Sequence, residues 1–270
     1  MMIRKLFSIS SSIGRQLAAA LLLVSIAIPA LADEDCDEAC QAARKAQDPL
    51  APINALLTDN TIGFGPNSDN RTYNYQLQPV FTIEGDSANV ILRGLLPYIG
   101  IPDGTGGTDY GYSDTVVQGF YVPEVDPGVF KLGYGVQVSL DTAKDGFGGP
   151  GNGAGVAVVG FQFAGNLAYG GVVGHLWGEG DFSVTTIQPI AFYSFEEFLG
   201  GGSYIGYSNT WSYDWDSKDW VIPIGATFGK TFILDGGYLL DMNAGVYPLV
   251  EAPDGGNDYQ LKFGISWFFP

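Results

Sequence analysis

The clearest pattern in the chain is the alternation of apolar and polar residues just before its last residue. From Tyr259 to Phe269 every second residue is large and apolar, and the residues between them are polar or small as far as Ser266. Alternation with a period of two predicts a β-strand with one apolar and one polar face. The apolar face carries Tyr259, Leu261, Phe263, Ile265, Trp267 and Phe269, and the other face carries Gln260, Lys262, Gly264 and Ser266.

Three further segments repeat this pattern clearly, and seven more show it less regularly. Many of them are near the ~9–11 residues that a tilted strand needs to cross a bilayer. The pattern therefore predicts an all-β chain. The clear segments are 71–83, 129–140 and 238–249, and the less regular ones are 88–98, 112–122, 153–163, 167–177, 182–195, 203–213 and 220–234.

Periodicity alone does not show whether the apolar face points into a core or out into lipid. A soluble barrel or sandwich also alternates, with its apolar face inward and its polar face in water. Here the polar faces hold Gly, Ser and Gln rather than solvated charges, the apolar faces end in aromatic residues as membrane girdles do, and the last strand closes in Trp267, Phe268 and Phe269. Lipid tolerates no unpaired sheet edge. The sequence thus predicts a closed transmembrane antiparallel β-barrel.

The connections between the segments set the expected number of strands. Bacterial barrels use an even number of strands, short periplasmic turns and longer external loops. If the C-terminus lies in the periplasm, the longer connections, such as 99–111 and 141–152, fall outside. The eleven segments then need one more strand ahead of them, and 57–64 is the candidate. We expect twelve strands, with ten as the alternative.

The N-terminus is typical of a targeting segment. Arg4, Lys5 and Arg15 precede an apolar run at 17–28, which a small-residue cleavage site follows. No later apolar run approaches the ~20 residues of a spanning helix. We expect export to the bacterial outer membrane, with a signal peptide over residues 1–32 cleaved after Ala32, a short periplasmic polar helix and linker over 33–55, and the barrel over 56–270.

Two cysteines, Cys36 and Cys40, lie in the acidic leader after the expected cleavage site. The periplasm is oxidising, so a disulfide can form there. A spacing of four on a helix would strain the bond, whereas a turn would allow it. A metal site would need more thiolates or histidines close by. We expect a local disulfide, and neither a metal nor another cofactor.

The net charge of the chain limits the classes of molecule that it is expected to bind. Loss of residues 1–32 would remove three of the 12 basic residues and none of the 29 acidic ones, which changes the net charge from −17 to −20. Binding to nucleic acid needs basic patches, so no nucleic-acid partner is expected. The expected partners are outer-membrane lipid and lipopolysaccharide, the barrel assembly machinery, and a small solute of unknown identity.

Charged and amide side chains on the polar faces are the candidates for the barrel interior. A Lys or Arg facing lipid at mid-depth costs ~2–4 kcal/mol, so Arg93, Lys131 and Lys262 should face the lumen. There they either pair and plug the barrel or line a route for a solute. A barrel of twelve strands lies between the filled barrels of eight strands and the aqueous channels of ~16–18 strands. The expected width therefore does not show whether the lumen is plugged or open. The lumen-lining candidates are Gln76, Gln78, Arg93, Lys131, Gln137, Gln188, Asp241 and Lys262.

The single histidine, His175, is the one residue weighed for catalysis. Barrel lipases use a Ser–His pair oriented by a third group, but the run at 174–178 around this histidine contains no serine. We therefore expect an interface histidine beside Trp177 near the outer rim, and a chain that is not an enzyme.

Two loop segments are also weighed for ligands. The Gly-rich run at 146–153 has no Lys-Ser/Thr and no following helix, so it predicts a flexible external loop rather than a phosphate loop. The run at 211–220 indicates an aromatic girdle with a solvated acidic turn. A rim that binds sugars or cations is the alternative, in which divalent ions would be shared with lipopolysaccharide phosphates.

A series of short motifs resembles one outer-membrane family. The family is that of the phenol-degradation meta-pathway transporters, often mislabelled neuromedin U, and the resemblance covers nearly the whole mature chain. Asp48 stands where that family usually has Asn. The motifs are Ala46-Gln47-Asp48-Pro49 with Asn60, Gln76-Leu77-Gln78-Pro79-Val80, Arg93 with Pro97, Gln188-Pro189, Trp220-Val221-Ile222-Pro223-Ile224-Gly225, Gly229-Lys230, and Tyr259-Gln260-Leu261-Lys262-Phe263-Gly264 running to Phe269-Pro270.

The resemblance implies more about fold and location than about substrate. From the family name alone, it implies passive transport of small, aromatic or apolar molecules. The alternative is a structural or surface-interaction barrel with a plugged lumen.

Overall fold

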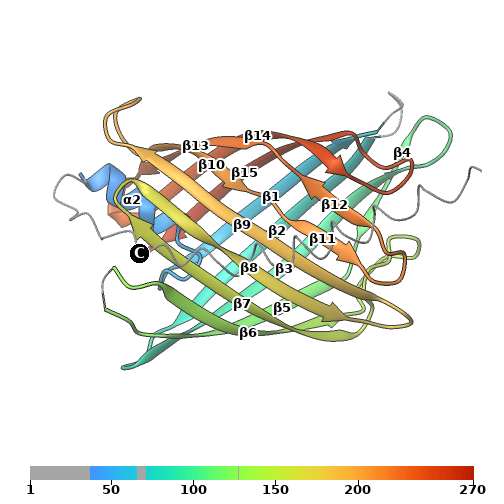
Figure 1. The fold of residues 1–270 in the computed structure, drawn as a ribbon, viewed down its shortest axis with the longest axis horizontal. Helices are drawn as coiled ribbons and strands as arrows, with labels where there is room; N and C mark the ends of the chain where they lie inside the picture. The colour runs from blue at the N-terminus through green and yellow to red at the C-terminus, as the bar shows by residue number, and fades with distance from the viewer. Residues whose placement is uncertain (1–36, 66–70, 127) are drawn as a thin grey trace, which may run out of the picture. The chain divides into compact units, whose positions relative to one another are not determined.

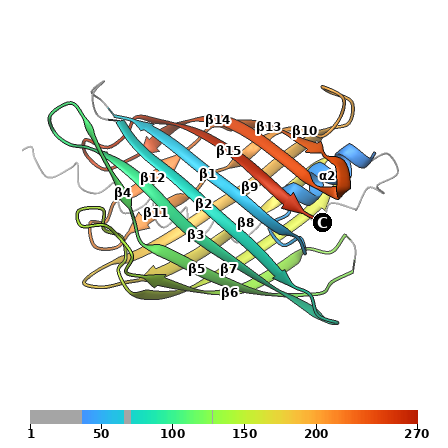
Figure 2. The ribbon, with the colours of Figure 1, turned by 180° about the vertical axis from the view of Figure 1, so that it is seen from behind.

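The computed structural model describes residues 37–65, 71–126 and 128–270. Within them the chain forms one closed antiparallel β-barrel, with a single α-helix at the end where the chain terminates (Figures 1 and 2). We call this the helix end and the opposite end, which carries the longer connections, the loop end. No helix in the described ranges is both long and apolar enough to cross a membrane.

Twelve strands build the barrel, and three of them are divided into two segments. These three are β4 with β5, β10 with β11, and β12 with β13. The elements are α2 (Glu38–Gln47), β1 (Asn54–Phe64), β2 (Arg71–Ile83), β3 (Ala88–Pro102), β4 (Thr108–Tyr112), β5 (Thr115–Pro123), β6 (Lys131–Leu140), β7 (Gly153–Ala164), β8 (Leu167–Trp177), β9 (Ser183–Phe195), β10 (Ser203–Ser208), β11 (Trp211–Asp214), β12 (Trp220–Pro223), β13 (Ala226–Ile233), the 3-10 turn η1 (Asp235–Gly237), β14 (Leu239–Glu251) and β15 (Tyr259–Phe269).

The first and last strands pair and close the barrel. The register of β1 on β15 runs from Asn54 opposite Phe269 to Phe64 opposite Tyr259. This closure confirms the predicted number of twelve strands and excludes ten. The predicted first strand at 57–64 is real and begins three residues earlier, at Asn54.

The alternation is arranged as a membrane barrel requires. On β6 the apolar residues point outward, and Val136 is 63% exposed, whereas the intervening Gln137 and Ser139 are 7% and 1% exposed. On β2, Phe81 is 61% exposed while Gln78 is 3% exposed. An apolar exterior with a polar interior is the reverse of a soluble barrel, so the predicted fold class is confirmed.

Three predicted strands are interrupted, and the interruptions have local causes. The segment 203–213 breaks at residues 209–210, where Asn209 turns its amide toward Gln260 on β15. The segment 220–234 breaks after Pro223, because proline cannot donate to a strand ladder. The segment 112–122 breaks at 113–114, and β4 extends it at the loop end by pairing with β3.

The N-terminal segment fills the helix end of the barrel. Asp37 caps α2 by accepting a hydrogen bond from the Cys40 amide at 2.8 Å. Arg44 Nη2 donates to the Gly165 carbonyl at 2.6 Å, and Asp48 pairs with Lys131 Nζ at 2.6 Å. Leu50, 2% exposed, packs into an apolar cluster of the barrel wall. These contacts hold residues 37–53, which we call the leader, inside the helix end of the lumen.

Two predictions on the N-terminal segment fall outside the described residues. Cleavage after Ala32 and the Cys36 half of the predicted disulfide both lie before residue 37, so both stay predictions. Cys40 is 1% exposed and is not a free cysteine.

Candidate functional site

Two cavities follow one another along the lumen. The cavity nearer the helix end, the helix cavity, has a volume of about 220 Å³, and residues of the leader such as Pro49 and Ile53 line it. The cavity nearer the loop end, the loop cavity, has a volume of about 680 Å³. Five side chains line both cavities and mark where they meet. We call them the waist: Asp59, Arg93, Val172, Gln188 and Lys262.

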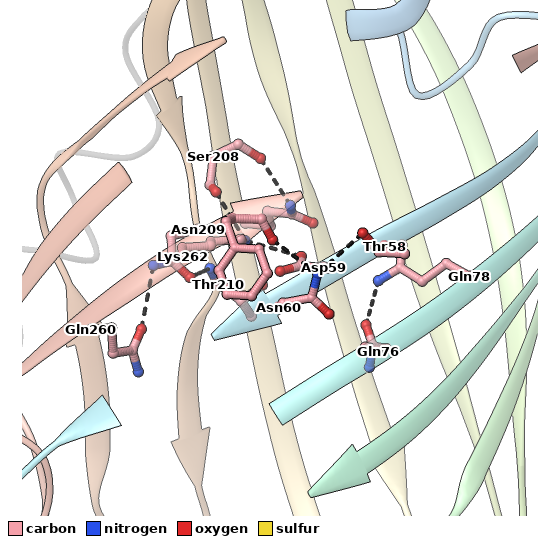
Figure 3. Close-up of polar contacts among 12 residues, drawn as sticks. Thr58, Asp59, Asn60, Gln76, Gln78, Ser208, Asn209, Thr210, Gln260 and Lys262 are labelled. Atoms are coloured by element: carbon pink, nitrogen blue, oxygen red, sulfur yellow. Dashed lines mark hydrogen bonds and ion pairs between the residues drawn. The ribbon is translucent and has the colours of Figure 1, made fainter. Parts of the chain in front are cut away.

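The break between β10 and β11 builds one side of the waist. A carbonyl freed from the strand ladder needs another partner. The Ser208 carbonyl at this break accepts a hydrogen bond from Lys262 Nζ on β15 at 3.1 Å, and the same ammonium pairs with Asp59 on β1 at 3.0 Å (Figure 3). Lys262 is thus fixed between two sides of the barrel, with its charge offset by Asp59.

Arg93 builds the opposite side of the waist. Its Nη2 donates to Gln78 Oε1, whose amide in turn donates to Gln76 Oε1 on the same strand (Figure 3 shows the two glutamines). Its Nε is buried and has no hydrogen-bond partner within the described residues. Two cations and one carboxylate leave the waist with a net charge of about +1, carried by Arg93. The waist therefore favours a negative or strongly polarisable group.

Amide side chains line the loop cavity. On neighbouring strands Arg93, Gln118 and Gln137 lie in one row, because Gln118 is directly opposite each of the other two. Gln118 Nε2 donates to Gln137 Oε1 at 3.0 Å, and Gln137 Nε2 donates to the His175 carbonyl at 3.0 Å. Between the waist and Asp114, the polar side chains of this half of the lumen are uncharged donors and acceptors.

The helix cavity has mostly apolar walls. Ile91, Phe120 and Phe192 are 3%, 5% and 9% exposed and belong to one cluster with Leu50. Several polar side chains interrupt these walls. One of them is Asp241 on β14, whose carboxylate is buried. Its oxygens accept hydrogen bonds from Tyr204 Oη at 2.9 and 3.0 Å, Thr231 Oγ1 at 2.9 Å and Asn243 Nδ2 at 3.1 Å.

A second carboxylate, Asp114, holds the largest loop over the loop end. It lies between β4 and β5, is 3% exposed, and accepts backbone hydrogen bonds from Thr142, Ala143 and Gly151 at 3.0, 2.9 and 2.8 Å. Burial alone would raise the pKa of Asp114, but these N–H donors outweigh it and hold the pKa below its ordinary value. The Gly-rich loop predicted to be flexible is therefore anchored.

The structure distributes the predicted lumen candidates over three places. Gln76, Gln78 and Gln137 line the loop cavity, Arg93, Gln188 and Lys262 form part of the waist, and Asp241 lines the helix cavity. Lys131 lines neither described cavity, because it pairs with Asp48 of the leader at the helix end.

Asp59 and Val172 of the waist and Gln118 of the loop cavity were missed in the sequence. Asp59 and Gln118 lie in segments whose alternation is weak. Asp59 shares a strand face with Thr61, and that alternation within 57–64 is the signal that could have identified it.

The histidine lies beside Trp177, as expected, with ring centroids 4.2 Å apart. The expectation that no serine lies near His175 is correct only for its neighbours in sequence. In space, Ser183 Oγ lies 3.2 Å from His175 Nε2, and Thr185 Oγ1 lies 2.8 Å from Nδ1. Pairing of β8 with β9 brings these residues together.

Metal ligands are not assembled in the described part of the chain. Over residues 37–65, 71–126 and 128–270, no three His, Cys, Asp or Glu side chains form a group that could hold a metal ion. Seven acidic residues are exposed in the connections at the loop end: Asp141, Asp145, Glu179, Asp181, Glu251, Asp254 and Asp258.

Closure, an apolar exterior and a polar lumen define an outer-membrane type of β-barrel. No family model matches the chain, and no curated protein matches it. Among solved structures, the chain is similar to the COG4313 outer membrane channel from Pseudomonas putida F1, with a TM-score of 0.58 and 14% identity over 80% of this chain and 94% of that chain. Outer membrane phospholipase A from Escherichia coli matches with a TM-score of 0.42 and 12% identity over 85% of this chain and 98% of that one. At such identities the first likeness shows the fold alone.

Proposed function

We propose that this protein is a passive channel of the bacterial outer membrane for small molecules. The observation that carries the proposal is the waist, because two cavities in series share the same lining residues there. A barrel whose only task is structural would gain more from an apolar core than from buried charges, which cost free energy unless they are paired. The resemblance to phenol-degradation transporters and the likeness to a solved outer membrane channel support the same proposal.

The preferred solute is small, neutral or weakly acidic, and aromatic. The exposed acidic residues of the loop end repel strong anions, whereas Arg93 at the waist attracts a negative or polarisable group. Beyond the waist, Phe120 and Phe192 offer an apolar wall. An aromatic ring with one polar substituent satisfies these three environments in order, from loop end to helix end.

A structural barrel with a plugged lumen is the second candidate. It is favoured by the leader, which lies in the helix cavity and is fixed by Leu50 and by the pair of Asp48 with Lys131. In the channel proposal, the same segment is a gate at the periplasmic mouth. The two candidates therefore differ in whether solutes pass.

Transport can be measured with the purified barrel. We expect steady single-channel currents in planar bilayers, and flux of small phenols and benzoates into proteoliposomes that exceeds the flux of sugars of similar size. Deletion should slow uptake of such aromatics at low supply, where passage through the outer membrane limits. If no current, no flux and no uptake defect is found, the structural candidate replaces the channel.

A further inference from the structure

A cluster of one imidazole and two hydroxyls lies on the barrel wall, away from the waist. His175 on β8 contacts Ser183 Oγ through Nε2 at 3.2 Å and Thr185 Oγ1 through Nδ1 at 2.8 Å. His175 is directly opposite Thr185, and Ser183 is the next residue on the same face of β9. Transport through the lumen uses none of these three side chains.

Strand alternation places the cluster on the outer surface. Val172 and Leu176 on β8, and Val184 and Thr186 on β9, line the lumen cavities. Successive side chains of a strand point to opposite faces. His175, Ser183 and Thr185 therefore face outward, and each is partly exposed.

Two tryptophans fix the cluster and indicate its depth. The Trp215 backbone N–H donates to the Ser183 carbonyl at 2.9 Å, and Trp215 Nε1 donates to Thr185 Oγ1 at 2.8 Å. The ring of Trp177 packs on His175, with centroids 4.2 Å apart. Both indoles are more than half exposed, at 53% and 55%. Tryptophans concentrate at the boundary between hydrocarbon and headgroups, so the cluster lies at the level of the lipid ester bonds.

The geometry has the parts of an activated nucleophile. A serine hydroxyl becomes reactive when a base lies within hydrogen-bond reach and a third group orients that base. When His175 Nδ1–H donates to Thr185 Oγ1, Nε2 is free to accept the proton of Ser183. Trp215 holds Thr185 from its other side. We propose that Ser183 and His175 form a catalytic pair, positioned by Thr185, that hydrolyses carboxylic esters of membrane lipids.

The reaction is balanced with water as the second reactant. Ser183 Oγ attacks the ester carbonyl carbon while its proton passes to His175 Nε2. The C–O bond to the lipid alcohol breaks, and His175 returns the proton to the departing oxygen, which leaves an acyl ester on Ser183. Interfacial water then attacks that ester with His175 as base. The fatty acid is released, and Ser183 regains its proton.

Covalent labelling tests the nucleophile directly. A long-chain fluorophosphonate, incubated with the full barrel in detergent, should label Ser183 and be found on its peptide by mass spectrometry. His175→Gln should reduce the labelling rate about 100-fold or more, as expected for loss of a general base. The matched control is Ser212→Ala on β11, which removes a lumen-facing hydroxyl opposite Thr186 of β9 and should leave labelling unchanged. Absence of label on Ser183 would overturn the proposal.

Fatty-acid release tests the activity and identifies the lipid. The barrel is reconstituted separately with phosphatidylethanolamine–phosphatidylglycerol vesicles and with lipopolysaccharide. Release from either one that Ser183→Ala abolishes supports the proposal and names the ester source. No release from both, or release that persists in Ser183→Ala, overturns it. Thr185→Val should slow release and Thr185→Ser should restore it, which a merely structural role in folding would not produce. Bilayer currents of the same preparations report on the channel separately, so failure of one activity does not imply failure of the other.

Discussion

The two halves of the lumen are built by the same strands and differ in chemistry. In the loop half a row of amides, as with Gln118 and Gln137, lies among apolar inward residues, and these amides bond to each other and to strand carbonyls. In the helix half buried apolar residues such as Phe120 and Phe192 pack around Leu50. The wider cavity, of about 680 Å³, therefore lies in the loop half, whereas part of the helix half packs like the core of a soluble protein.

The difference shows what the leader contributes. A membrane barrel normally has one apolar face, which meets lipid. Where a strand is apolar on both faces, the inner face needs something to cover it, and here residues 49–53 and α2 provide that cover. The waist lies between the two cavities, so in the proposed channel a solute would pass Arg93 before it meets the apolar cluster.

The largest effect is expected from weakening the packing of the helix half. Leu50→Ala removes a side chain that is 2% exposed, and a buried Leu→Ala change costs about 2–5 kcal/mol. We expect a lower urea midpoint in detergent and larger bilayer currents, because the leader loosens from the lumen. The control is Leu56→Ala on the outer face of β1, where lipid or detergent fills the gap. Equal effects of both variants would show that the leader is not packed as described.

A smaller effect is expected at Asp241, a buried carboxylate of the helix half. Asp241→Asn keeps the shape but leaves the hydroxyl donors of Tyr204 and Thr231 poorly matched, which costs about 1–3 kcal/mol when they are buried. The urea midpoint of unfolding, monitored by tryptophan fluorescence, should be correspondingly lower. Asp254→Asn at the exposed loop end should leave the midpoint unchanged. No shift for Asp241→Asn would mean that its hydrogen bonds contribute nothing to stability.

The smallest effect is local and depends on pH. The pKa of Asp114 is held below its ordinary value by backbone donors, so its contribution is complete above the unfolded pKa of about 3.9 and is lost as pH falls through the folded pKa. In wild type, amide exchange in residues 142–151, corrected for the intrinsic rate, should therefore accelerate at acidic pH.

The matched variants test the cause. Asp114→Asn should already exchange faster at pH 7, by an amount equivalent to about 1 kcal/mol, and should lack the acid step. Asp145→Asn in the same loop is exposed and should behave as wild type. An acid step that persists in Asp114→Asn would assign the effect to another group.

Strands with a polar inner face could be predicted from the sequence, because one face alternates clearly against the other there. The faces of the last strand and of 71–83 were predicted correctly. The twelfth strand followed from the even strand number of bacterial barrels together with the orientation that the lengths of the connections indicated. The segments that looked irregular were those with apolar residues on both faces. In β7, for example, Val156 and Val158 face out while Val159 and Phe161 are buried inside. Only the leader explains this pattern, and the sequence does not show where the leader packs.

Residues that meet across the barrel could not be found by local inspection. Lys262 and Asp59 are 203 residues apart, and the carbonyl that completes their site arises from a strand break at 209–210 that alternation does not signal. Ser183 is eight residues from His175, yet only the pairing of β8 with β9 shows that they touch. The direction in which a side chain faces could be predicted from alternation, whereas the residues that it contacts on other strands could not.

In the proposed channel solutes pass a waist whose net positive charge comes from Arg93, and the ion selectivity of the reconstituted barrel reports this charge. The reversal potential of the reconstituted barrel is recorded across a tenfold KCl gradient for wild type, Arg93→Gln and Lys131→Gln. The Lys131 variant is the control, because that lysine pairs with Asp48 outside the waist. We expect Arg93→Gln to shift the reversal potential toward the potassium equilibrium value and Lys131→Gln to shift it much less. Equal reversal potentials for wild type and Arg93→Gln, or no current at all, would show that Arg93 does not control passage through the lumen.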